Sequence, residues 1–88
     1  MGRKYIKVIA EFSKEGIIAP LSLFIDGNSY EITKVIESKR MAATKIGGTG
    51  YRYEIVVGNK TQYIWLEDVV FNKTIGAKWF IDSDALNV

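Results

Sequence analysis

The fold is decided by residues 21–32, which read Leu-Ser-Leu-Phe-Ile-Asp-Gly-Asn-Ser-Tyr-Glu-Ile. Apolar side chains occupy every second position from Leu21 to Ile25, which is the pattern of a strand with one buried face. The cluster Asp26–Ser29 combines tolerance for positive φ with side chains that hydrogen-bond to the backbone, so it favours a tight turn. A second strand begins at Tyr30. The stretch therefore predicts a β-hairpin.

Period-two patterning recurs on both sides of this hairpin. Pro20 lacks a backbone N–H, which confines it to an edge, a strand start or a β-bulge. The apolar positions change phase between Tyr30 and Ile36, as they do at a bulge or a sharp bend. Gly58–Lys60 indicates a tight turn between two strands. The predicted strands are residues 4–12, 21–25, 30–35, 51–57, 61–66 and 77–82, with a shorter apolar run at 69–71.

The composition agrees with a strand-rich fold. The 88 residues include 12 Ile, 7 Val, 5 Thr and 11 aromatic residues, but only 6 Ala and 4 Leu. This length allows one domain with a single thin core. We predict an all-β domain over residues 1–82, either a small SH3-like barrel or a sandwich of five or six antiparallel strands, followed by a frayed tail at 83–88. Several strands are apolar on both faces, so either the sheet closes on itself or a partner covers one face.

The least regular stretch is residues 37–46. It contains good helix formers, but its apolar residues form no stripe at helical spacing and no usual cap precedes it. An extended arm is favoured, with a helix as the alternative. Gly47–Gly50 then ends any regular element. This segment lacks the Gly-Lys-Ser/Thr of a Walker loop and precedes a strand, so it indicates a turn or bulge rather than a phosphate loop.

The sequence contains no His and no Cys, which excludes several classes of chemistry. Zinc fingers, Cys-His and Ser-His-Asp nucleophile systems, c-type haem attachment and disulfides all require these residues. The adjacent Glu67 and Asp68 point to opposite faces of an extended chain, so salt bridges are favoured over general acid–base catalysis. We therefore expect a non-catalytic protein with no metal and no cofactor.

Targeting signals are also lacking at the N-terminal end of this sequence. The apolar run after Lys7 is broken at Glu11, before it reaches the length of a signal-peptide core. No apolar stretch is long enough to cross a bilayer. A cytoplasmic location, without a membrane partner, is the expectation.

Charge is distributed unevenly, although the net charge is only +2. Residues 39–52 contain four cations and no Asp or Glu. A basic arm beside a glycine loop and two tyrosines is a surface that can follow a phosphate backbone and stack bases, as small barrels do with single strands. A merely solvated basic face and an acidic protein partner are the alternatives. The candidate residues for binding nucleic acid or another polyanion are Lys39, Arg40, Lys45, Arg52, Tyr51 and Tyr53.

The aromatic residues near the C-terminal end suggest a second kind of surface. Trp65 lies out of phase with Ile64 and Leu66, so it points outward on a strand with one buried face. Exposed aromatic pairs suit a protein interface or a stacking platform. The alternative is a sheet that is covered on both faces. The candidate interface residues, for a protein partner or a homodimer, are Tyr63, Trp65, Trp79 and Phe80.

A set of short motifs runs through the chain from about residue 5 to residue 82. They are Pro20, Asp26-Gly27, Tyr30 with Ile32 and Val35, Gly47-Gly48, Gly50, Arg52-Tyr53 and Trp79-Phe80-Ile81-Asp82. In these motifs the sequence resembles a family of short uncharacterised proteins found mainly in Gram-positive bacteria. Phe24 departs from the family pattern, which has Trp there. The resemblance implies a compact all-β protein and carries no known activity.

Overall fold

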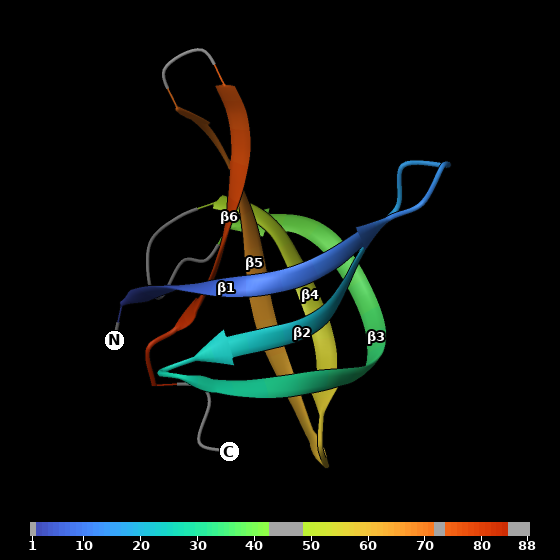
Figure 1. Ribbon diagram of the computed structural model, residues 1–88, viewed down its shortest axis with the longest axis vertical. Helices are drawn as coiled ribbons and strands as arrows, with labels where there is room; N and C mark the ends of the chain where they lie inside the picture. Colours follow the sequence, from blue (N-terminus) through green and yellow to red (C-terminus); the bar gives the residue numbers. More distant parts are fainter. Residues whose placement is uncertain (1, 43–48, 72–73, 85–88) are drawn as a thin grey trace.

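The computed structural model describes residues 2–42, 49–71 and 74–84, and these form six antiparallel strands (Figure 1). The predicted all-β class is confirmed. The strands are β1 (Arg3–Phe12), β2 (Ile18–Ile25), β3 (Asn28–Ala42), β4 (Thr49–Val57), β5 (Lys60–Phe71) and β6 (Thr74–Asp82).

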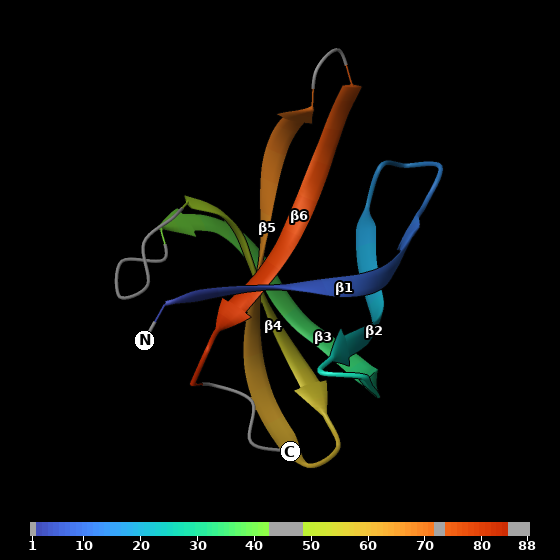
Figure 2. The same ribbon diagram turned by 60° about the vertical axis from the view of Figure 1, so that its left-hand side comes forward.

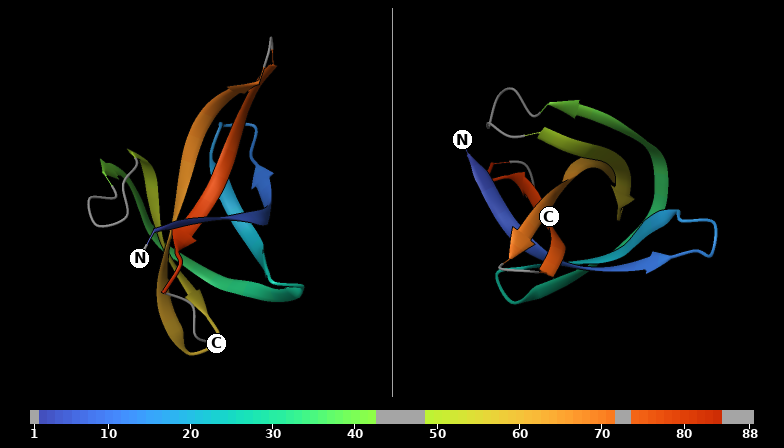
Figure 3. Two further views of the ribbon diagram at one scale, coloured as in Figure 1. Left: turned by 90° about the vertical axis from the view of Figure 1, so that its left-hand side faces the viewer. Right: turned by 90° about the horizontal axis from the view of Figure 1, so that it is seen from above.

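The six strands close into a barrel. Each strand pairs with the next in the chain, and β1 also pairs with β6 over Arg3–Ile6 and Trp79–Asp82. Figure 3 shows the strands arranged around one interior when the molecule is viewed from above. Of the two architectures predicted from the sequence, the barrel is therefore correct and the sandwich is not. The sheet covers its own inner face, as closure requires.

The turns follow the predicted chemistry. Ile25 faces Asn28 across a two-residue turn in which Asp26 has φ 51° and Gly27 has φ 83°. Positive φ at both central residues defines a type I′ turn, whose twist matches that of the flanking strands. The predicted hairpin is thus confirmed. A second two-residue turn joins β4 to β5 and begins at Gly58, where φ is 61°.

Bulges bend the long strands around the barrel. The β1–β2 register shifts between Ile9 and Ala10, and Ala10 faces Pro20, so the proline stands at a bulge, one of the three positions predicted for it. Two further shifts interrupt β3 after Ile32 and after Val35, where the apolar pattern changes phase. Because bulges increase local bending, β3 pairs first with β2 and then with β4.

The predicted arm is the second half of β3. Residues 37–42 pair with β4, so the extended interpretation is confirmed for them, whereas 43–46 lie outside the described residues. Gly47 and Gly48 also lie outside. The predicted turn is wrong at Gly50, which is part of β4 and pairs with Met41.

The barrel interior holds one apolar core. The inward side chains alternate along each strand, and Leu23, Ile55 and Ile64 are fully buried. The remaining members of the core are Ile25, Ile32, Tyr53, Val57, Leu66, Trp79 and Ile81, with Ile6, Val8, Ala10, Ile18 and Tyr30 packed around them.

The two ends of the described chain meet beside β1. The Ser83 N–H donates a hydrogen bond of 3.0 Å to the Gly2 carbonyl, and Asp84 N–H donates to Asp82 Oδ1 at 3.0 Å. Ser83 thus has a backbone contact with the N-terminal segment, and the fraying predicted for 83–88 stays a prediction. Residues 85–88 lie outside the described part.

Gly50 is a position where only glycine fits. A Cβ atom there would meet the backbone carbonyl of Leu66 on the neighbouring strand. We predict that Gly50→Ala lowers the free energy of unfolding by about 2–3 kcal/mol, because backbone atoms move only at the cost of ladder hydrogen bonds. The measurement is urea denaturation. Gly58→Asn is the control, since a Cβ there meets open space and Asn tolerates positive φ; a change of about 0.5 kcal/mol or less is expected. Equal effects of the two substitutions would contradict the prediction.

Candidate functional site

Two cross-strand rows of side chains lie on opposite faces of the same sheet, which runs from β3 through β4, β5 and β6 to the start of β1. Figure 2 shows how β1 crosses this sheet. Successive side chains on a strand point to opposite faces, so neighbouring register rows do the same. The inner row, which includes core residues, is Arg40, Tyr51, Leu66, Trp79 and Ile6. The outer row is Lys39, Arg52, Trp65, Phe80 and Tyr5.

Phe80 is the anchor of the outer row. It is 0% exposed although it points away from the barrel core. The Trp65 ring stacks on it with centroids 5.6 Å apart and planes inclined by 7°, and Tyr5 meets it edge-on at 5.8 Å. These three aromatic rings therefore form a second, smaller apolar cluster on the outside of the barrel.

Polar contacts fix one side of this outer cluster. The Arg3 guanidinium lies 3.1 Å from Glu67 Oε2 and 5.8 Å from the centroid of the Phe80 ring. The Tyr5 hydroxyl donates a hydrogen bond of 2.9 Å to Glu67 Oε1. That bond to a carboxylate raises the pKa of the Tyr5 hydroxyl above its ordinary value. Strands β1 and β5 are thus linked across β6 by side chains as well as through the ladder.

The other side of the cluster is basic and more open. The Arg52 guanidinium lies 4.2 Å from the centroid of the Tyr63 ring, and Tyr63 as a whole residue is 38% exposed. Lys39 is exposed and faces Arg52 from β3. Trp65 is half-buried, with its ring 6.5 Å from that of Tyr63. We call Lys39, Arg52, Tyr63 and Trp65 the aromatic–basic face.

The cations on this face are not held in strong ion pairs by any described carboxylate, although the register places Glu37 and Glu54 on the same face. Lys39 Nζ lies 4.0 Å from Glu37 Oε1, but both side chains are about half exposed, and such surface pairs contribute little. Arg52 makes no ion pair with any carboxylate that the structure describes. Trp65 Nε1 is buried and has no hydrogen-bond acceptor among the described atoms, so stacking on Phe80 sets the orientation of the indole.

The structure divides the predicted polyanion-binding residues. Lys39 and Arg52 lie together on the outer face, while Arg40 and Tyr51 lie on the inner face at the end of the barrel, with 5.9 Å between guanidinium and ring centroid. Tyr53 is only 6% exposed and packs against Trp79 in the core, so it offers no stacking surface. Lys45 lies outside the described residues.

The predicted interface residues are divided in the same way. Tyr63 and Trp65 point outward together, as expected. Trp79 is buried in the barrel core and Phe80 beneath its aromatic neighbours, so neither presents an exposed surface. The alternative of a sheet covered on both faces accounts for them. Sequence reasoning missed Tyr5, because only the β1–β6 register brings it to Phe80.

The described side chains form no cluster of three carboxylate, imidazole or thiol groups able to hold a metal ion. Among the described elements there is no helix with the length and apolarity that crossing a membrane requires. No protein-family model, curated protein or solved structure matches the chain.

Truncation of Phe80 tests the outer cluster. Phe80→Ala leaves a cavity between Trp65 and Tyr5, so we predict a loss of about 3–5 kcal/mol in the free energy of unfolding. Tyr63→Ala, which removes an exposed ring from the same face, is predicted to cost about 1 kcal/mol or less. Chemical denaturation measures both. Similar values for the two variants would show that Phe80 is not the anchor.

Tyr53 predicts a weakening of the fold at alkaline pH. Burial, with a smaller contribution from Tyr51, raises the pKa of the Tyr53 hydroxyl above its ordinary value. The folded state therefore favours the neutral phenol. The contribution of Tyr53 to the free energy of unfolding is constant below about pH 10 and falls as the pH rises further. We expect Tyr53→Phe to reduce this fall when urea denaturation is compared at pH 8, 9, 10 and 11. An unchanged dependence on pH in the variant would refute the assignment.

Proposed function

We propose that this protein is a small non-catalytic binding module that holds single-stranded nucleic acid on its aromatic–basic face. The contact between the Arg52 guanidinium and the exposed Tyr63 ring, at 4.2 Å, carries the proposal. It joins, on one surface, a cation without a described carboxylate partner and an aromatic ring open to solvent. Those are the two elements of proteins that bind single strands without sequence preference.

Each residue of the face has a part in this binding. Lys39 and Arg52, on adjacent strands, contact successive phosphates. Tyr63 and the exposed part of Trp65 accept bases by stacking, and Arg52 keeps its guanidinium over the Tyr63 ring until a phosphate approaches. A base can lie on these rings only when it is unpaired, so the ligand is single-stranded.

The aromatic–basic face predicts that the affinity for single strands depends only weakly on salt concentration. Of the three predicted cations that the structure describes, Lys39 and Arg52 lie on it and Arg40 is on the opposite side of the sheet. Two phosphate contacts on a single strand give a slope of about −1.4 in a plot of log affinity against log salt, at roughly 0.7 for each contact.

A protein-interaction or homo-oligomerisation module is less well supported. Of the four residues proposed for it, Trp79 and Phe80 are buried, and the other two belong to the aromatic–basic face. From the sequence we also expect a cytoplasmic location and a bacterial source.

The test is titration of fluorescently labelled oligothymidylate and oligouridylate with the full chain, followed by anisotropy. Arg52→Gln and Tyr63→Ala are expected to weaken binding by about tenfold each, since one phosphate contact or one stacked base is worth about 1–3 kcal/mol. Arg40→Gln is the matched control: it removes the same charge from the other face of the same strand pair and should change affinity by less than about twofold.

Three outcomes would contradict the proposal. Binding that is absent at low salt refutes it directly. Equal losses for the two arginine variants would indicate attraction by net charge alone. Preference for a duplex of the same length would exclude base stacking on Tyr63. Sedimentation at several protein concentrations tests the alternative of homo-oligomerisation. If the protein self-associates and Tyr63→Ala abolishes the association, the aromatic–basic face is a protein interface.

A further inference from the structure

The seam where the barrel closes is open along much of its length. The β1–β6 ladder ends at the pair Ile6 and Trp79. From Lys7 onward β1 pairs only with β2, and β6 pairs only with β5 on the other side of the gap. Figures 1 and 2 show the two strands diverging from this point. The edge of β1 from Lys7 to Phe12 therefore faces a gap instead of a partner strand.

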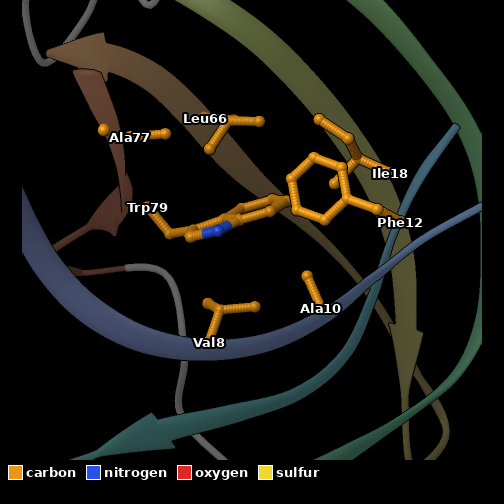
Figure 4. Close-up of a pocket in the computed structure, with 8 residues that line it drawn as sticks. Val8, Ala10, Phe12, Ile18, Leu66, Ala77 and Trp79 are labelled. Atoms are coloured by element: carbon orange, nitrogen blue, oxygen red, sulfur yellow. The ribbon is translucent and has the colours of Figure 1, made fainter. Parts of the chain in front are cut away.

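An apolar pocket of about 500 Å³ lies behind this gap. Val8, Ala10 and Phe12 supply one wall from alternate positions of β1, and Leu66 and Trp79 supply the opposite wall. Figure 4 shows the Trp79 ring extending from β6 into the pocket, with Leu66 on one side, Val8 and Ala10 on the other, and Phe12 beside Ile18 at the far end. Phe12 is 72% exposed, so the pocket leaves a large ring uncovered. The volume is in the range of ligand sites, and the lining demands an apolar occupant.

The free edge begins at an unpaired positive charge. Lys7 is exposed on the outer side of β1, where its ammonium lies 5.3 Å from the centroid of the Phe24 ring. It makes no ion pair with the carboxylates of the described residues. A carboxylate on a neighbouring strand would lie opposite it, and such cross-strand charge pairs are favourable.

We propose that β1 accepts an extended peptide as an additional strand, with apolar side chains at every second position in the pocket and a carboxylate opposite Lys7. A peptide matches all three features of the gap. Its main chain pairs with the free edge of β1, its inward side chains cover Phe12 and fill the space beside Trp79, and its outward carboxylate meets Lys7. A small apolar molecule would leave the β1 edge and the charge unused. This site is separate from the aromatic–basic face.

The probe is the synthetic peptide acetyl-Ser-Glu-Val-Thr-Val-Ser-Val-Gly-amide, titrated into the isotope-labelled full chain and followed by NMR. We expect shift changes in the amides of residues 7–12 and in the Trp79 indole, with the amides of Arg52 and Tyr63 unaffected. A permuted peptide with its three valines in succession has the same composition but cannot place them all inward. It should bind at least about tenfold more weakly, as should a version N-methylated on the edge that faces β1.

Charge reversal at Lys7 tests where the carboxylate of the bound peptide lies, without altering the core. Lys7→Glu is expected to weaken binding of the Glu-bearing peptide by about fivefold and to favour a peptide with Lys in place of Glu. The matched control is Lys34→Glu, the same change on an exposed position of β3, which should leave both affinities unchanged.

Four results would overturn the proposal. They are equal binding of the alternating and permuted peptides, binding that survives N-methylation, shifts confined to the aromatic–basic face, and saturation of the Trp79 shifts by dodecanoate with no response to peptide. The last would assign the pocket to small amphiphiles. Because the oligonucleotide test depends on Arg52 and the peptide test on Lys7, failure of either proposal leaves the other intact.

Discussion

Closure of the sheet by the first and last strands is the constraint on which the rest of the structure depends. Arg3–Ile6 pairs with Trp79–Asp82, and this short ladder gives β6 a second neighbour. It places Trp79 inside the barrel and Phe80 under Tyr5 on the outside. Residues 79–81, which are apolar on both faces of β6, are thereby buried on both, one face by the core and one by a layer of aromatic rings. Without this ladder, Phe80 would lose the cover of Tyr5, and Trp79 would lose Ile6 as its neighbour.

The local features of this fold could be predicted from sequence because each has a local cause. The Asp26-Gly27 turn, the bulge at Pro20 and the alternation of inward residues need only nearby residues to specify them. The fate of Phe80 could not be predicted in this way. Its burial depends on Tyr5 at the other end of the chain, and no periodicity within β6 carries that information.

The candidate site was predictable in its residues but not in their grouping. The basic cluster of residues 39–52 was visible in the sequence, and alternation already separated Arg52 from the tyrosines beside it. What the sequence lacked was the register between strands. The ladder brings Lys39 beside Arg52 and Trp65, and so joins residues from two separate hypotheses on one face. The same ladder directs Arg40 to the other side of the sheet.

The strand order also affects how the chain folds into the closed barrel. Five of the six ladders join strands that follow one another in sequence, and only the seam between β1 and β6 joins the two ends. Hairpins of low sequence separation form quickly, whereas a contact between chain ends waits for loop closure. The open sheet that precedes closure exposes Phe80 and two free edges, which makes it the form most prone to associate with other chains. A few residue pairs at the seam therefore separate the closed barrel from an open sheet with free edges.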